Sequence, residues 1–214
     1  MIKTEKTKIF RVNDDQLASE DLTTCLDVLN QGGLLIVPTD TVYGIVCNAF
    51  DPRAIQKIYD LKGRNYTKPL PILLSSSQQL GLVATDLPKE IFKLVDSFWP
   101  GPLTVVVRTA PIVLHASRGK ETIAVRVPDH GVIKKILDEK QIPIVATSAN
   151  LSGRPSLQRG IDVIDAFSES VDVIVDGGSC PIGQESSVVD ATHFPFTVLR
   201  EGALLKEDLL AAIN

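Results

Sequence analysis

The chain has few of the residues from which metal, redox and disulfide sites are built. Its three cysteines, Cys25, Cys47 and Cys180, are odd in number and widely spaced, so neither a disulfide framework nor a CxxC site is indicated. The three histidines form no HxxxH or HxH pair that could hold zinc. Aromatic residues make up only 5% of the chain, which argues against RNA binding by stacked bases.

Long apolar runs and the common nucleotide-binding motifs are also missing. Apolar stretches such as residues 34–37 are too short to span a bilayer, and the polar N-terminus lacks the apolar core of a signal peptide. The sequence contains no GxxxxGK[ST], GxGxxG or GxSxG motif. We therefore expect a soluble cytoplasmic protein without membrane contact, which binds any nucleotide by other means.

The residues that are present favour a folded chain. Apolar residues make up 44% of the 214 residues and the formal net charge is −4, so disorder is not indicated. Leu22, Cys25 and Leu29 recur at helical spacing, which predicts a helix over residues 14–31. Asp51, followed by a proline, predicts the start of a second helix, and Gly63 predicts its end.

Strand and helix patterns alternate along the rest of the chain. Short β-type apolar runs predict strands at 34–37, 71–74, 103–108, 122–127, 142–146, 171–175, 186–189 and 197–200. Helical patterns occur at 88–98, 131–139 and 206–213. Some neighbouring strands are too close together for helical crossovers, so we predict one α/β domain with a mixed sheet.

A local basic cluster stands out in this acidic protein. Residues 53–68 carry five basic side chains and one acidic side chain, which suits a compact anion such as a nucleotide phosphate. Arg53 and Lys57 lie in mid-helix, where a solvated helix face is an equal explanation. Lys62, Arg64 and Lys68 flank the helix end and a Lys-Pro turn, where functional residues are more common.

Polar side chains also interrupt the predicted strands. Alternation in 122–127 places Thr122, Ala124 and Arg126 on the face opposite the apolar side chains. A guanidinium in mid-strand is costly to bury unless it meets an anion, so Arg126 either reaches the surface or lines a polar site.

Hydroxyl and amide side chains gather at other strand ends. Ser148 and Asn150 follow the strand at 142–146, where they form either an Asx-type turn or part of a site. Thr41 follows the strand at 34–37, Ser186 opens a strand, and Arg200 closes the last one. Together these positions predict a single concave site at the strand ends of an α/β sheet.

Several strings in the chain resemble the YrdC-type threonylcarbamoyl-adenylate synthases. They are, in order, PTDTVYG at 38–44, LKGR at 61–64, KPL at 68–70, FWPGPLT at 98–104, AVRVP at 124–128, TSANLSG at 147–153, SSVVD at 186–190 and VLREGA at 198–203. The resemblance covers about residues 32–205. Active synthases of that family carry Lys-x-Arg and Ser-x-Asn pairs, which are Lys62/Arg64 and Ser148/Asn150 in this sequence.

The resemblance implies a fold and a reaction. The expected fold is a single YrdC-like domain over 1–214, with a core of about 14–205, a twisted, mostly open mixed sheet, surrounding helices and no separate C-terminal domain. The expected reaction converts L-threonine, bicarbonate and ATP into threonylcarbamoyl-AMP and pyrophosphate. The product is expected to pass to a complex that transfers the threonylcarbamoyl group to tRNA, and tRNA contact by this chain is left open.

The resemblance also implies roles for particular residues. The expected catalytic residues are Lys62, Arg64, Ser148 and Asn150, with Lys62 on either the carbamate or the phosphates. The expected ATP contacts are Arg64, Lys68, Thr122, Asn150 and Arg200. The expected threonine contacts are Thr41, Arg126, Ser148 and Ser186. Mg²⁺ is expected to arrive with ATP and to be held by ATP oxygens and water, without protein ligands.

A few positions depart from the family pattern. Asn65 stands where a proline is usual, which loosens the turn after Arg64, and Ser187 replaces a common threonine while keeping the hydroxyl. Gln158 stands where a threonine is frequent, so no nucleotide contact is assigned to it. Leu73 stands where longer relatives tend to have histidine, which leaves the amino-acid selectivity open.

Two other functions compete with the synthase hypothesis. A basic concave surface could bind double-stranded or structured RNA, although the isoelectric point near 5.4 argues against it. A carbamoyl-transfer enzyme is the other alternative, because YrdC-like domains occur within larger hydrogenase-maturation proteins. Those proteins carry additional zinc-finger and acylphosphatase-like parts, for which 214 residues leave no room.

Overall fold

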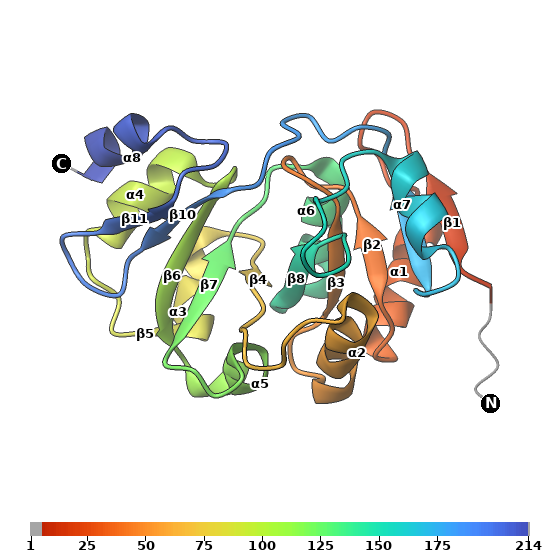
Figure 1. Cartoon of the computed structure of the whole chain (residues 1–214), viewed down its shortest axis with the longest axis horizontal. Helices are drawn as coiled ribbons and strands as arrows, with labels where there is room; N and C mark the ends of the chain where they lie inside the picture. The colour runs from red at the N-terminus through yellow and green to blue at the C-terminus, as the bar shows by residue number, and fades with distance from the viewer. Residues whose placement is uncertain (1–5, 214) are drawn as a thin grey trace.

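One open mixed sheet runs through the molecule (Figure 1). The computed structural model describes residues 6–213. In sheet order the strands are β1 (Lys8–Arg11), β9 (Val173–Asp176), β2 (Leu35–Val37), β3 (Gly44–Asn48), β8 (Ile144–Ser148), β4 (Ile72–Leu73), β7 (Thr122–Arg126), β6 (Leu103–Thr109), β10 (Ser187–Asp190) and β11 (Thr197–Arg200), and β5 (Ala84–Thr85) pairs with β6. Strand β6 is antiparallel to β7 and parallel to β10. The predicted α/β class with an open mixed sheet is confirmed.

Helices lie on both sides of this sheet. They are α1 (Ser19–Asn30), α2 (Pro52–Lys62), α3 (Leu80–Val83), α4 (Ile91–Phe98), α5 (Leu114–Ser117), α6 (Gly131–Lys140), α7 (Gly160–Phe167) and α8 (Lys206–Ile213), with 3-10 turns η1 (Ser77–Gln79) and η2 (Pro111–Val113). Within residues 6–213, every helix is too short or too polar to cross a membrane.

Some predicted boundaries were wrong. Helix α1 begins at Ser19 and not at residue 14, because Asp14 and Asp15 have φ angles of 51° and 56°, which no right-handed helix accommodates. Strands β1 and β3 and helix α7 were not predicted at all. Strand β8 extends to Ser148, which pairs with Gly44, so Ser148 lies within the strand and not after it.

The two faces of the sheet are covered to different extents. In β2, Ile36 packs into a large core that includes residues of α2, α4 and α7, whereas Leu35 packs into a second core with α1 and α6. In β7, Ile123 also faces the large core, as the alternation predicts. On the other face of β6 and β7, Thr104 and Arg126 belong to neither apolar core. Helices α1 and α6 therefore leave a polar region over this half of the sheet.

Helix α2 has the ends that its sequence predicts. Asp51 caps its N-terminus by accepting hydrogen bonds from the backbone amides of Arg53 (2.8 Å) and Ala54 (3.3 Å). Gly63 follows with a φ of 58°, and the amide of Arg64 donates to the Tyr59 carbonyl at 3.0 Å. This tight ending places the predicted Lys-x-Arg pair across the end of a rigid helix, with Lys62 as its last residue and Arg64 just after the cap.

Candidate active site

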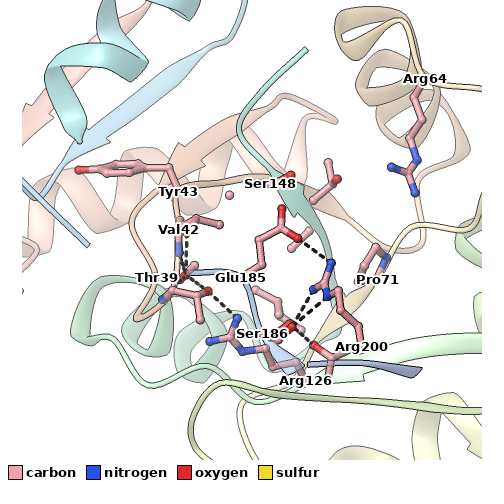
Figure 2. Close-up of a pocket in the computed structure, with 16 residues that line it drawn as sticks. Thr39, Val42, Tyr43, Arg64, Pro71, Arg126, Ser148, Glu185, Ser186 and Arg200 are labelled. Carbon is pink, nitrogen blue, oxygen red and sulfur yellow. Dashed lines mark hydrogen bonds and ion pairs between the residues drawn. The ribbon is translucent and has the colours of Figure 1, made fainter. Parts of the chain in front are cut away.

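A pocket of about 290 Å³ opens on the polar region of the sheet (Figure 2). It is lined by side chains from strand ends and loops that are far apart in the sequence: Thr39, Thr41, Val42, Tyr43, Gly44, Arg64, Pro71, Leu73, Thr104, Arg126, Ala146, Thr147, Ser148, Glu185, Ser186 and Arg200. The convergence of hydroxyl and guanidinium groups on a single pocket, predicted from the sequence, is therefore observed.

Arg126 forms one end of the pocket. Its guanidinium donates from Nε to the Gly101 carbonyl at 2.9 Å and from Nη1 to Thr41 Oγ1 at 2.7 Å. Nη2 lies 2.5 Å from Asp40 Oδ1, and both side chains are buried. Burial lowers the pKa of Arg126 and the Asp40 carboxylate opposes that effect. Arg126, which is the last residue of β7 and not in mid-strand as predicted, thus lines a polar site and meets an anion.

The hydroxyl of Thr41 belongs to a chain of hydrogen bonds. Thr39 Oγ1 donates to the Val42 carbonyl at 2.7 Å, accepts from the backbone amides of Thr41 (3.1 Å) and Val42 (3.3 Å), and lies 3.0 Å from Thr41 Oγ1. Thr41 Oγ1 in turn accepts from Arg126. The Thr41 hydroxyl is therefore held between Thr39 and Arg126 where it lines the pocket.

Arg200 and Ser186 form another side of the pocket. Arg200 donates to the Ser186 carbonyl from Nε (3.2 Å) and Nη2 (2.7 Å), and Nη1 forms an ion pair with Glu185 at 2.6 Å. The other Glu185 oxygen accepts from Ser156 Oγ at 2.6 Å. Ser186 Oγ lies 2.7 Å from Thr104 Oγ1, so its hydroxyl is also held in place.

Arg64 lies on the side of the pocket away from Thr39 and Arg126 (Figure 2). Its Nη2 donates to the Pro69 carbonyl at 3.0 Å, and burial lowers its pKa. Its Nε is buried and has no hydrogen-bond partner among the described residues. A buried donor without a partner is unfavourable, so Arg64 is suited to receive an anionic ligand.

Lys62 does not line the pocket, because its ammonium group is occupied by the end of β8. Nζ donates to the Ser148 carbonyl, to the Asn150 carbonyl (2.8 Å) and to Asn150 Oδ1 (2.9 Å). These three bonds use all three protons of the ammonium group. Burial, with a smaller contribution from Arg64, lowers the pKa of Lys62 to about 8. Lys62 therefore holds the segment that carries the predicted Ser-x-Asn pair.

Asn150 is also held by its neighbours. Its Oδ1 accepts from Ser148 Oγ at 2.6 Å, and its Nδ2 donates to the carbonyls of Leu151 (3.0 Å) and Arg154 (2.6 Å). Ser148 lines the pocket and Asn150 lies just outside its lining. Lys62 and the Ser-x-Asn pair, which are far apart in the sequence, thus form one hydrogen-bonded network, whereas the Arg64 side chain bonds to the Pro69 carbonyl.

Two other predicted ATP contacts also lie outside the pocket lining. Lys68 is exposed on the turn after α2, and Thr122 stands at the opposite end of β7 from Arg126. Their roles stay predictions. Of the predicted threonine contacts, Thr41, Arg126, Ser148 and Ser186 all line the pocket.

The sequence analysis missed two carboxylates of the site. Asp40 lies within the quoted PTDTVYG string and Glu185 directly precedes Ser186, yet neither was selected. The partner of Asp40 is Arg126, and local sequence patterns do not indicate that pairing. The signal that the sequence offers for Asp40 and Glu185 is that each directly precedes a predicted site residue. In the described part of the chain, no group of three His, Cys, Asp or Glu side chains is placed to hold a metal ion.

A family model and several known proteins match this chain. A family model described as Sua5/YciO/YrdC, telomere recombination, matches residues 27–202. Threonylcarbamoyl-AMP synthase of Pyrococcus abyssi is 40% identical over 187 residues, which cover 87% of this chain and 55% of that protein. The Bacillus subtilis protein of the same name is 35% identical and covers 98% of this chain and 62% of its own length.

A solved structure is similar over almost the whole chain. The crystal structure of Pyrococcus abyssi Sua5 complexed with L-threonine superposes with a TM-score of 0.92 at 36% identity. The match covers 97% of this chain and 61% of that one. The chain thus spans less than two thirds of the length of each of these relatives.

The lowered pKa of Lys62 predicts a pH dependence of stability. The unfolded chain keeps the lysine proton to a higher pH than the folded protein, whose Lys62 pKa is about 8. Between about pH 8 and pH 10, the free energy of unfolding of the wild type should therefore rise relative to that of Lys62→Met, by on the order of 1 kcal/mol. Denaturant unfolding of both proteins across this range measures the difference, and a constant difference contradicts the prediction.

Proposed function

The chain belongs to the Sua5/YciO/YrdC family, and on that premise we propose that it is a threonylcarbamoyl-AMP synthase. It uses L-threonine, bicarbonate and ATP, releases pyrophosphate, and acts in the cytoplasm. Curated relatives of that name favour this function over RNA binding and carbamoyl transfer. The observation that carries the proposal is the pocket itself, in which three guanidinium groups and several hydroxyls face one cavity.

The threonine end of the proposed site is built around Arg126. Its charged, buried guanidinium suits the α-carboxylate of the amino acid, because charge-assisted bonds to carboxylates are strong and directional. Thr41, held between Thr39 and Arg126, contacts the amino group or the substrate hydroxyl. Ser148 and Ser186 lie around the same cavity and complete the contacts to the hydroxyl and carbamate.

The nucleotide end is built from the other cations. Arg64, with a buried unpartnered Nε, binds phosphate oxygens, and Lys68 adds a point charge from the turn after α2. Arg200 also contacts the nucleotide, and Thr122 and Asn150 are proposed to contribute on that side. The ion pair with Glu185 and the two bonds to the Ser186 carbonyl hold the Arg200 side chain at the pocket.

The proposed reaction has two steps. The threonine amino nitrogen forms a bond to the carbon of bicarbonate, water is lost, and a carbamate results. A carbamate oxygen then attacks the α-phosphorus of ATP in line, the bond from that phosphorus to the bridging oxygen breaks, and pyrophosphate leaves. Charge accumulates on phosphoryl oxygens, so catalysis depends mainly on positioning and on electrostatic stabilisation. Lys62 contributes by holding Ser148 and Asn150, with Arg64 beside them.

Mg²⁺ is proposed to enter with ATP. Glu185 is the carboxylate that lines the pocket, and both of its oxygens are already bonded to Arg200 and Ser156. Glu185 by itself does not provide a coordination shell for Mg²⁺. ATP oxygens and water are therefore the expected ligands of the ion. The product carries an activated acyl group, and we propose that it passes to a complex that transfers this group to an adenosine of tRNA.

Pyrophosphate release tests the proposed reaction. The protein, ATP and Mg²⁺ should release pyrophosphate only when L-threonine and bicarbonate are both present, because the attacking oxygen belongs to their carbamate. Omission of each co-substrate in turn is the control. Equal release without threonine would indicate simple ATP hydrolysis, and no release from well-folded protein would contradict the synthase function.

Arg64→Ala tests the nucleotide end. Removing a guanidinium that stabilises phosphate charge should lower the rate on the order of 10²-fold or more, without loss of the fold. Arg53→Ala is the matched control, because Arg53 lies on α2, the helix that precedes Arg64, with its side chain 93% exposed. Near-normal turnover of Arg64→Ala, with thermal unfolding like that of the wild type, would show that the phosphate role is wrong.

A further inference from the structure

A buried carboxylate that does not line the pocket lies next to Arg126. Asp40 does not line the pocket, whereas its neighbour Thr41 and its partner Arg126 both do. We infer that Asp40 is a positioning residue for amino-acid binding, which holds the Arg126 guanidinium in the orientation that receives the substrate carboxylate. The inference rests on the proposed function and deepens it.

The contacts of Asp40 are specific. Its Oδ1 accepts from Arg126 Nη2 at 2.5 Å and from the backbone amide of Asp129 at 3.1 Å. Its own backbone carbonyl accepts from the Ile182 amide at 2.9 Å. The Asp40 side chain is 6% exposed and that of Arg126 is 8% exposed. The carboxylate is thus fixed by two further segments of the chain and cannot swing with the arginine.

The donors of Arg126 divide between the protein and the cavity. A guanidinium has five N–H groups, and three of them are used by Gly101, Thr41 and Asp40. One N–H remains on each of Nη1 and Nη2, the number that a bidentate carboxylate needs. Because Asp40 and Thr41 bind one proton on each terminal nitrogen, they fix the plane in which the remaining two protons lie.

Among the described residues, Arg126 is the ion-pair partner of the Asp40 carboxylate. Oδ2 is buried and has no hydrogen-bond partner among the described residues. An unpaired buried carboxylate oxygen is costly, and the close ion pair compensates for it. Without Asp40, Arg126 would keep only the Gly101 carbonyl and the Thr41 hydroxyl, neither of which carries charge.

Direct binding of L-threonine tests the inference on the full chain. Calorimetry should show a roughly tenfold or greater loss of affinity for Asp40→Ala, which corresponds to the loss of one buried charge-assisted bond. Affinity for ATP should stay within about threefold of the wild type, since the nucleotide contacts lie elsewhere. Asp129→Ala is the matched control, because its side chain is 58% exposed and the backbone amide that holds Asp40 is retained.

A double-mutant cycle separates positioning from a general structural role. If Asp40 acts through Arg126, then Asp40→Ala should weaken threonine binding little further once Arg126→Ala is present. Independent losses in the double variant would overturn the inference, as would wild-type threonine affinity in Asp40→Ala or an equal loss of threonine and ATP binding.

A second variant keeps the test decisive if Asp40→Ala does not fold. Asp40→Glu retains the charge but moves the carboxylate by one methylene group, so threonine affinity should still fall by roughly tenfold. Affinity within about threefold of the wild type would overturn the inference. Absence of threonine binding in the wild-type protein would instead overturn the proposed function, and the role of Asp40 with it.

Discussion

Guanidinium groups can be buried around a pocket only if each has partners that compensate for its charge, and the candidate site depends on this constraint. Arg126 is paired with Asp40, and Arg200 is paired with Glu185. Arg64 has a backbone carbonyl and an unpartnered Nε, with no carboxylate among the ion pairs of the described residues. The pocket therefore contains two guanidinium groups that carboxylates hold in place and one, Arg64, that has no carboxylate partner in the described part of the chain.

The fold supplies this arrangement by covering one face of the sheet incompletely. Helices α1 and α6 pack their apolar side chains over β2, β3, β8 and β9, whereas the same face of β6 and β7 carries Thr104 and Arg126. The large core covers the other face of the sheet and stabilises its strands. Side chains of the site thus stand on rigid strands and on the end of α2, which limits their freedom before any ligand binds.

Much of the fold and of the candidate site was predictable from local sequence patterns, and the predictions that were wrong have identifiable physical causes. The caps of α2 and the alternation in β7 are local signals, and both are confirmed. Strand β1 was missed because it is mostly exposed and lacks alternation, and α1 was extended too far because positive φ angles at aspartates have no strong sequence signal. The Asp40–Arg126 pair joins residues 86 positions apart, a contact that no spacing within one sequence indicates.

The central claim is that one pocket brings threonine, bicarbonate and ATP together, and isotopic labelling tests it most directly. The protein should be incubated with ATP, Mg²⁺, L-threonine and ¹³C-bicarbonate, and the nucleotide products should be analysed by mass spectrometry. The account predicts threonylcarbamoyl-AMP that carries the ¹³C label, with none formed when threonine is omitted. AMP without an attached threonylcarbamoyl group, or an adenylate that lacks the label, would contradict it.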